Sequence, residues 1–402
     1  MADRRVVVTG IGVLSAIGNG RDGFLAGLRE GRSGAGPVTA FDTTGFGYGQ
    51  TCEVADFADD ELSEYGRATR MGAAAAGMAV RDAGLTPGML CGVTGLVAVG
   101  TTEGDARDVD DLAATEVAKG LADLDPLPAR RARFSRMPTA IADELGLADV
   151  ELITLPDVCA AGTYAIGYGL DAIRSGDVDY ALCGGADAIC HRTFAAFYRM
   201  GALSRDVCRP FDRDRTGVVF GEGAAMLVLE SLDSALARNA VIHAELLDYN
   251  LNCDAFHPTR PVKESVAECM RGALANSAVA PGEIDLIMAH GTGTPTNDPM
   301  ESAAFAEVFA GGEIPPVSAL KSMIGHTMGA ASVHSCIAAM LAVEHGFLPP
   351  TINHRTLDPD CPVDCVPNEA RAGEPRTVLV NALGFGGANA AVVLRRYQGV
   401  SQ

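Results

Sequence analysis

Short apolar runs alternate with amphipathic stretches along the whole sequence, and this alternation restricts the chain to the α/β fold class. The runs that predict strands are Val6–Val13, Gly95–Val99, Leu152–Leu155, Tyr180–Gly184, Ala225–Leu229, Ala244–Tyr249, Ile284–Ala289, Val317–Ala319, Val378–Ala382 and Ala390–Leu394. Apolar recurrence at helical spacing predicts helices over Ala68–Ala83, Thr163–Arg174, Val266–Ala275, Met300–Phe309 and Ala330–Glu344. Equal numbers of strands on each side of residues 235–240 suggest two similar halves, 1–240 and 241–402.

The charge balance excludes several classes of partner. The net charge is −20, whereas a protein that binds nucleic acid or an anionic membrane needs a basic surface. No apolar run reaches the roughly 20 residues of a membrane span, so we expect a soluble, cytoplasmic protein. The eleven cysteines are scattered, without the paired spacing of a zinc site or a disulfide framework. We therefore expect no metal site.

Cys159 has the sequence context of a nucleophile. The apolar run Leu152–Leu155 is stopped by Pro156, and Cys159 follows where the next helix is predicted to begin. The helix dipole and the unpaired N–H groups of a helix start stabilise a thiolate, so we expect a lowered pKa for this thiol. The small residues 160–162 leave room for a substrate beside it.

Two histidines accompany this cysteine. His290 ends a predicted strand and begins the segment His-Gly-Thr-Gly-Thr-Pro, and His326 ends the segment Lys-Ser-Met-Ile-Gly-His that begins at Lys321. Lys321 is one of only three lysines in the chain. One cysteine nucleophile with two separate histidines is suited to forming carbon–carbon bonds on a thioester.

The three motifs, in this order, resemble those of the β-ketoacyl-acyl-carrier-protein synthases, and the resemblance runs from Val6 to about Leu394. It implies the thiolase-like fold, an α/β architecture of two pseudo-duplicated βαβ halves stacked as five layers, αβαβα. The N-terminal half would supply the cysteine, and the C-terminal half both histidines and a glycine-rich gate loop. The resemblance also implies a homodimer, or a heterodimer with a ketosynthase-like subunit, joined near the nucleophile strand. No cofactor would be bound, because an acyl carrier protein delivers the substrate on its phosphopantetheine arm.

The resemblance assigns a catalytic role to five residues. Cys159 would be acylated. His290 and His326 would donate hydrogen bonds to the enolate oxygen that forms when a malonyl thioester loses CO2. Lys321 would hold the network around His326 through Glu301, with a direct bond from Lys321 to the malonyl carboxylate as the alternative.

A glycine-dense segment follows the strand Val378–Ala382, but it lacks the Lys-Ser/Thr pair of a nucleotide-binding loop. By resemblance, Phe385 is the gate over the cysteine, and its N–H joins that of Cys159 in the oxyanion hole for the acyl carbonyl. The residues expected to contact the substrate and its pantetheine arm are Gly384, Gly386, Thr292 and Thr294.

Arginines cluster at positions 130, 131, 133 and 136 of this acidic chain. Such a run is often a solvated face, but an acidic carrier protein needs a basic patch for docking. By resemblance, the docking residues are Arg67, Arg70, Arg130 and Arg131.

Two positions depart from the family pattern. Asp157 would oppose thiolate formation if it pointed at Cys159, and we expect it to face away. In fatty-acid relatives, the region of Thr101–Gly104 is small and apolar and lines the acyl tunnel, whereas the residues here are polar. This difference favours a polar or short substrate, or a pocket shaped by another subunit. We therefore favour polyketide synthesis over housekeeping fatty-acid elongation.

Three alternatives remain at this point. The chain could be a housekeeping fatty-acid elongation synthase. It could be a non-catalytic, chain-length-determining partner subunit, but such partners usually lose the nucleophile that is present here. A thiolase or hydroxymethylglutaryl-type synthase would have a second Cys or a Glu base where His326 and Lys321 stand.

Overall fold

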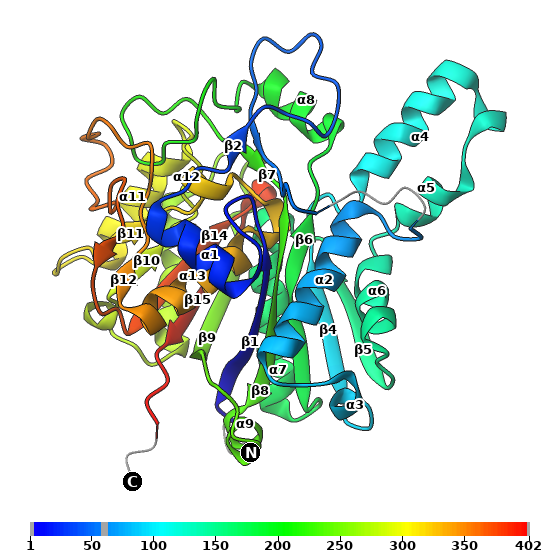
Figure 1. Cartoon of the computed structure of the whole chain (residues 1–402). Helices are drawn as coiled ribbons and strands as arrows, with labels where there is room; N and C mark the ends of the chain where they lie inside the picture. The colour runs from blue at the N-terminus through cyan, green and yellow to red at the C-terminus, as the bar shows by residue number, and fades with distance from the viewer. Residues whose placement is uncertain (1–3, 58–62, 400–402) are drawn as a thin grey trace.

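A ten-stranded mixed sheet runs through the centre of the computed structural model, which describes residues 4–57 and 63–399 (Figure 1). In spatial order its strands are β11 (Val317–Ser318), β10 (Leu286–Met288), β14 (Thr377–Leu383), β15 (Ala388–Arg395), β9 (Ala244–Cys253), β1 (Val6–Leu14), β8 (Gly223–Ser231), β6 (Tyr180–Asp187), β4 (Gly95–Gly100) and β5 (Val150–Leu155). Each of the ten predicted strands is present, with ends shifted by a few residues. The prediction of an α/β protein is confirmed.

The sheet consists of two five-stranded sets that share one topology. β1 and β9 pair antiparallel where the two sets meet. From β1 outward, β8 and β6 follow in antiparallel pairings and β4 and β5 in parallel ones. From β9 outward, β15 and β14 are likewise added antiparallel, and β10 and β11 parallel. The first set ends with β8 at Ser231 and the second begins with β9 at Ala244, on either side of residues 235–240.

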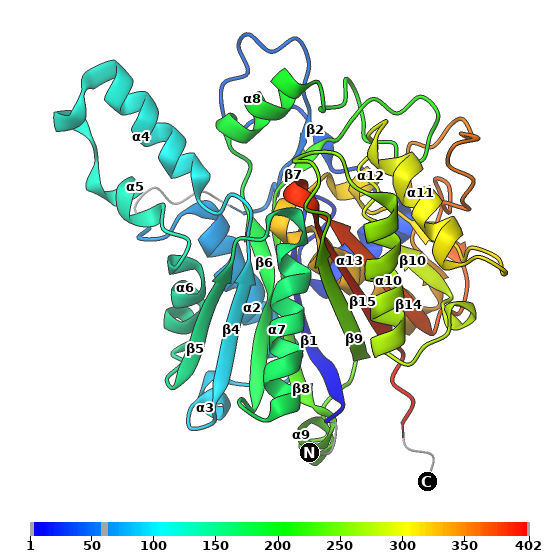
Figure 2. The ribbon, with the colours of Figure 1, turned by 180° about the vertical axis from the view of Figure 1, so that it is seen from behind.

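Helices cover both faces of each set. α7 (Ala161–Ser175) and α13 (Ala331–His345) share one core with alternate residues of both sets, such as Leu96 and Val380. The opposite face of the first set packs on α2 (Arg67–Asp82) and α6 (Arg136–Leu145), and that of the second on α10 (Lys263–Asn276) and α11 (Asn297–Val308). Because side chains of a strand alternate between faces, two helix layers can bury one strand set. The result is the five-layer αβαβα stack. Figure 2 shows the same sheet from behind, with α7 in front of it.

The remaining elements lie mainly around one end of the sheet and at its edges. They are α1 (Gly20–Glu30), α3 (Pro87–Leu90), α8 (His191–Met200), α9 (Leu232–Ala237), α12 (Lys321–Ile324), the small sheet β2 (Ala35–Gly36), β3 (Thr51–Cys52) and β7 (Phe220–Gly221), and the pair β12 (Phe347–Leu348) and β13 (Arg371–Ala372). Within the described ranges, no helix has the length and apolar character needed to cross a bilayer.

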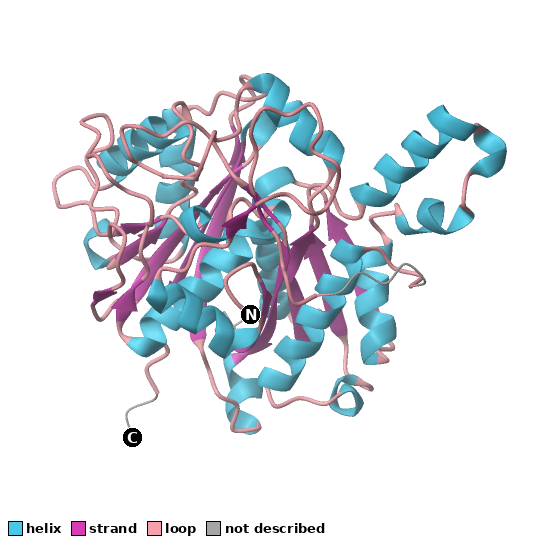
Figure 3. Ribbon diagram, turned by 45° about the horizontal axis from the view of Figure 1, so that its top comes forward, coloured by secondary structure: helices cyan, strands magenta, loops and turns pink. Residues whose placement is uncertain are grey.

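One helical hairpin projects from the body of the protein. It consists of α4 (Ala106–Lys119) and α5 (Pro126–Arg131) and extends away from the sheet (Figures 1 and 3). Val117 and Leu121 on this hairpin are 90% and 71% exposed. Next to it, β5 forms the open edge of the sheet, and its residues Glu151 and Leu152 are exposed as well. The sequence analysis did not predict this hairpin.

Candidate active site

Cys159 lies at a strained turn between β5 and α7. A short 3-10 helix, η2 (Val158–Ala160), joins the two elements, and Val158 has φ 46°, a conformation that β-branched residues rarely adopt. Gly384 leaves room for this turn, because a Cβ at position 384 would lie 2.4 Å from Cγ2 of Val158. The turn therefore depends on a close approach between the cysteine segment and the glycine-rich loop.

The thiol of Cys159 is protonated at neutral pH. Burial raises the pKa of Cys159 to about 12, and the carboxylates of Asp187 and Glu103 act in the same direction, while Lys321 opposes them. The expectation of a lowered pKa was wrong, because burial outweighs the favourable position at a helix start. The sulfur must therefore lose its proton as it attacks the substrate.

The imidazoles of His290 and His326 lie edge to face, with ring centroids 5.4 Å apart and planes at 84°. Nδ1 of His290 accepts a hydrogen bond from the N–H of Leu383 at 3.2 Å, and Nδ1 of His326 accepts one from the N–H of Met328 at 3.2 Å. Burial and the nearby Lys321 hold the pKa of both histidines well below the ordinary value. Each ring is therefore neutral, with its proton on Nε2.

Lys321 and Glu301 both hold His290. The buried ammonium of Lys321 donates to the carbonyl oxygen of His290 and lies 3.3 Å from its Nδ1. The carboxylate of Glu301, also buried, accepts hydrogen bonds from the N–H groups of His290 and Gly291 at 2.7 and 2.8 Å. It also accepts one from the side-chain amide of Asn381 at 2.8 Å. We expected Lys321 to support His326 through Glu301. In the described part of the chain, Lys321 and Glu301 instead meet at His290.

A cavity leads to the cysteine and both histidines. Phe385 lines it and stacks on Phe197 of α8, with ring centroids 5.2 Å apart and planes at 6°. Phe385 is 39% exposed, so one face of the stack borders the solvent. The structure thus brings the predicted gate residue to the cavity.

The predicted pantetheine contacts also line this cavity. Thr292 and Thr294 face it, and their hydroxyl oxygens lie 2.9 Å apart. Gly384 is part of the lining, whereas Gly386 turns the loop with φ 83°. The N–H of Gly386 donates to the carbonyl oxygen of Pro258 at 2.7 Å, which ties the glycine-rich loop to the segment 257–261 at the same cavity.

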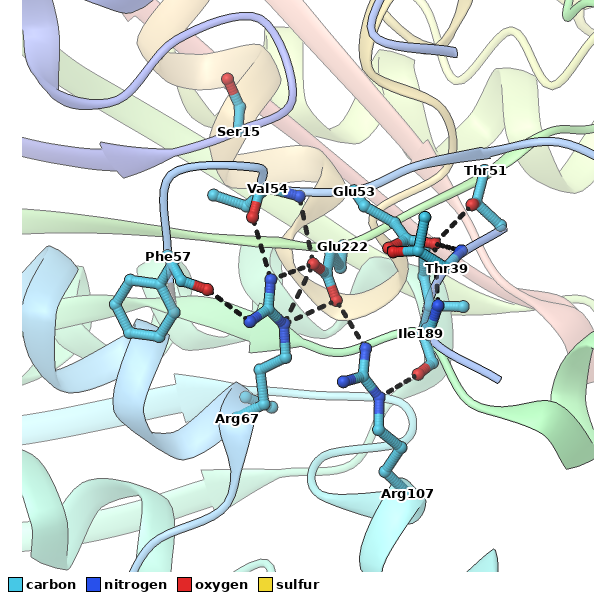
Figure 4. A network of polar contacts seen from close by, with 12 residues as sticks. Ser15, Thr39, Thr51, Glu53, Val54, Phe57, Arg67, Arg107, Ile189 and Glu222 are labelled. Atoms are coloured by element: carbon cyan, nitrogen blue, oxygen red, sulfur yellow. Dashed lines mark hydrogen bonds and ion pairs between the residues drawn. The ribbon is translucent and has the colours of Figure 1, made fainter. Parts of the chain in front are cut away.

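The structure corrects the docking assignment of Arg67 (Figure 4). Its side chain is 9% exposed, and the guanidinium group bonds the fully buried carboxylate of Glu222 at 2.6 Å and the carbonyl oxygens of Val54 and Phe57. Arg107 reaches the same carboxylate at 3.3 Å. Arg67 is therefore part of a buried ion-pair network and is not available to a carrier protein.

Of the other expected docking residues, only Arg130 is exposed. The side chain of Arg131 is 10% exposed and bonds the carbonyl oxygen of Ser63 and the carboxylate of Asp108. Arg70 lies over the ring of Phe57, 5.3 Å from its centroid. The assignment of Arg131 to docking was therefore wrong, because α5 turns this side chain towards the body.

Two carboxylates near the nucleophile differ in role. Burial raises the pKa of Tyr164 to about 12, and the carboxylate of Asp157 acts in the same direction. Asp187 was missed by the sequence analysis. It is buried at the end of β6, and its carboxylate accepts hydrogen bonds from the N–H groups of Glu103 and Gly329 at 2.7 Å each. The sequence signal that could have revealed Asp187 is a single aspartate at the end of an apolar strand.

The arrangement can perform acyl transfer to Cys159 and stabilise an oxyanion with two neutral N–H donors. Among the described residues, no group of three or more His, Cys, Asp or Glu side chains is arranged to hold a metal ion. All eleven cysteines are free thiols.

Comparison with known proteins decides the family. The model described as beta-ketoacyl synthase, N-terminal domain, matches residues 3–235, and the corresponding C-terminal domain matches residues 243–355. The chain belongs to the beta-ketoacyl synthase family. These enzymes are acyltransferases of the thiolase-like fold, which confirms both the resemblance and the fold predicted from the sequence.

Relatives of this beta-ketoacyl synthase match it over nearly its whole length. The 3-oxoacyl-(acyl-carrier-protein) synthase 2 of Synechocystis sp. is 36% identical over 98% of this chain and 99% of its own. A solved structure described as the ishigamide ketosynthase/chain length factor is 53% identical, with TM-score 0.96, over 99% of this chain and 100% of that one. A type II PKS ketosynthase, AntDE, in complex with its acyl-carrier protein AntF, is 31% identical with TM-score 0.92, over 98% and 100%.

Proposed function

We propose that this chain is an elongating ketosynthase that condenses an acyl group on Cys159 with a malonyl group carried by an acyl carrier protein. The observation that carries the proposal is the pair of neutral imidazoles of His290 and His326 in the cavity that contains the thiol. Both rings have Nδ1 occupied as an acceptor, so both Nε2–H groups are available to a developing oxyanion.

The reaction then has two stages. In the first, the sulfur of Cys159 attacks the carbonyl carbon of the acyl thioester, the bond to the carrier thiol breaks, and the cysteine proton ends on the released thiol. In the second, the malonyl thioester loses CO2, and the two histidines donate to the enolate oxygen. The enolate carbon attacks the acyl carbonyl, the new C–C bond forms, and the cysteine leaves and recovers a proton.

Polyketide synthesis is the pathway that we favour. Two of the structures that resemble this chain are an ishigamide ketosynthase/chain length factor and a type II PKS ketosynthase. Polar residues near the thiol, including Glu103, fit a less uniformly apolar substrate than a fatty acyl chain. Fatty-acid elongation is the second candidate, favoured by the similarity to the Synechocystis enzyme.

We propose a paired ketosynthase subunit and an acyl carrier protein as partners. The open edge strand β5 precedes the nucleophile turn, and an unpaired edge is a ready site for pairing with a second chain. The ishigamide structure couples a ketosynthase with a chain length factor, and the AntDE structure holds a carrier protein. Retention of Cys159 makes this chain the catalytic subunit of such a pair. Phosphopantetheine would arrive on the carrier, and a cytoplasmic location stays a prediction.

The test compares Cys159→Ala with Cys159→Gln. We expect both variants to lose acylation and condensation, and only the Gln variant to release CO2 from malonyl carrier, because its amide imitates an acylated cysteine. Intact-protein mass measures acylation, and labelled CO2 measures decarboxylation. Condensation that persists in either variant would exclude Cys159 as the nucleophile.

The histidine roles need a separate test. His290→Ala and His326→Ala should still accept an acyl group on Cys159, but each should lose about 10²–10³-fold in decarboxylation, as expected when one oxyanion donor is removed. If neither variant can be acylated, a histidine acts as the base for the thiol, and the role of enolate donor must be revised.

A further inference from the structure

His243 lies where the two strand sets meet. It stands directly before β9, and its backbone N–H donates to the carbonyl oxygen of Val8 in β1 at 2.9 Å. The side chain of His243 is 2% exposed. Arg238, on the segment before it, forms an ion pair with Glu230. The polar partners of the buried imidazole must therefore come from the helices packed around the joint.

Two carboxylates from different helices flank this imidazole. Nε2 of His243 lies 2.8 Å from Oδ2 of Asp82, the last residue of α2. Nδ1 forms an ion pair with Oε2 of Glu344, near the end of α13, at 3.6 Å. A neutral imidazole carries one N–H, so only the protonated ring can direct an N–H towards each carboxylate. The site is therefore built for an imidazolium.

The charges around the ring balance when it is protonated. Arg21 of α1 forms an ion pair with the same carboxylate of Glu344, and its charge also acts on that of Asp82. The strand β1, which packs against the site, carries no charged residue. Two cations thus face two carboxylates. Loss of the proton from His243 leaves an excess negative charge in a largely buried site.

The pKa of His243 agrees with this geometry. Burial acts to lower the pKa, but the contacts with Asp82 and Glu344 outweigh it and raise the pKa above the ordinary value of 6.5. The stabilisation from such a group is complete below the ordinary pKa, and it is lost as the pH rises through the raised pKa. Contact with His243, and then with Arg21, lowers the pKa of Glu344 to about 2, so this carboxylate stays charged throughout that rise.

We propose that His243 is a proton-dependent latch, which holds the ends of α2 and α13 at the joint between the strand sets and releases them as the pH rises. In the closed latch, the imidazolium bridges Asp82 and Glu344, and Arg21 extends the link to α1. When the proton passes to water, the ring can donate to only one carboxylate. The three helices should then open locally more often, while the sheet stays intact.

The first test uses the wild-type protein alone. Hydrogen–deuterium exchange, read by peptide mass over residues 20–30, 76–83 and 338–346, measures opening of the three helices. Rates at about pH 6 and about pH 9 are corrected for the intrinsic pH dependence of exchange. We expect opening to increase about tenfold for each unit by which the pKa of His243 exceeds the ordinary value. Peptides of β8 should stay protected.

Three variants assign the response to the latch. His243→Gln has no proton to lose, so its helices should already open at the lower pH, with no further change at the higher one. Glu344→Gln removes the partner of Nδ1, so opening should begin at lower pH. His354→Gln is the matched control, because Asn368 holds this loop histidine through its backbone N–H and carbonyl oxygen. It should respond to pH as the wild type does.

Nitrogen NMR of labelled histidine adds a direct readout of the proton. Near neutral pH, the ring of His243 should carry a proton on both nitrogens, and Glu344→Gln should shift its titration to lower pH. Equal opening of the wild type at the two pH values would overturn the inference, even if His243→Gln did not fold. A wild-type response that persists in His243→Gln would overturn it as well.

Discussion

The ammonium of Lys321 lies 3.3 Å from Nδ1 of His290 and donates a hydrogen bond to the carbonyl oxygen of the same residue. Burial, this cation and His326 together hold the pKa of His290 well below the ordinary value. A cation beside Nδ1 opposes a proton on that nitrogen, so it fixes the tautomer in which Nε2 carries the hydrogen. Lys321 thereby positions the Nε2–H donor of His290 through contacts with the opposite side of the ring and with the backbone.

Replacing Lys321 by Met should raise the pKa of His290, because the change removes the opposing cation. In the wild type, the imidazole should titrate well below the ordinary pKa of a histidine, and in the variant its titration should move towards higher pH. Nitrogen NMR of labelled histidine measures this directly. Decarboxylation should fall by tenfold or more while acylation of Cys159 persists. Lys263→Met, at an exposed ion pair, is the control.

A titration that is identical in the Lys321 variant and the wild type would contradict this role. In that case, burial alone would keep His290 neutral, and Lys321 would serve only to hold the backbone at His290.

The reactivity of Cys159 should rise steeply with pH. Burial raises the pKa of its thiol to about 12, so below that pH the thiolate fraction grows about tenfold for each pH unit. Alkylation by iodoacetamide, followed by peptide mass at Cys159, should therefore accelerate about tenfold per unit from pH 7 to pH 9. The peptide readout keeps the exposed Cys91 and Cys253 out of the measurement. A rate that levels off above pH 7 would show a thiolate stabilised by the helix start.

The sequence predicted the strands and most core helices because burial leaves a pattern in the residues themselves. The apolar run Val378–Ala382, for example, predicts a strand, and β14 is a strand buried on both faces. The motif residues Cys159, His290 and His326 were also recognisable, and the structure brings them to one cavity. The α4–α5 hairpin leaves no such pattern, because it buries few of its residues.

What the sequence could not predict depends on partners far along the chain. Arg67 is an ordinary arginine until Glu222, 155 residues later, is placed beside it by the fold. The raised pKa of Cys159 has the same origin, because it comes first from burial by the whole fold and then from Asp187 and Glu103, which belong to other segments. A helix start lowers the pKa of a thiol through local contacts, but the burial that raises this pKa depends on the whole fold.

Gly384→Ala should slow acylation without unfolding the protein. An added Cβ would lie 2.4 Å from Cγ2 of Val158, so the cysteine turn or the glycine-rich loop must shift. We expect acylation of Cys159 to fall by tenfold or more, since misplacement of about 1 Å can cost about 10²-fold. Gly282→Ala, where the added Cβ has nothing within 4 Å, is the control. Normal acylation with an unchanged melting temperature would show that the turn tolerates the methyl group.

Arg130 and Arg131 are neighbours in sequence but should respond oppositely to the same change. Arg131→Glu places a carboxylate against Asp108, whose pKa burial and Asp105 already raise to about 6. We expect it to lower the free energy of unfolding by about 3 kcal/mol, as when a buried ion pair loses one partner. Denaturant unfolding measures this.

Arg130→Glu should leave unfolding unchanged, because the side chain is exposed on α5. If Arg130 helps an acidic carrier to dock, this variant should use carrier-bound substrate more slowly, with a weaker dependence on salt, while a small free thioester reacts at the wild-type rate. Stopped-flow association over a range of salt concentrations separates these effects. Equal rates for the variant and the wild type with carrier-bound substrate would remove Arg130 from the docking surface, and the carrier would then have to approach through other exposed residues around the cavity that Phe385 borders.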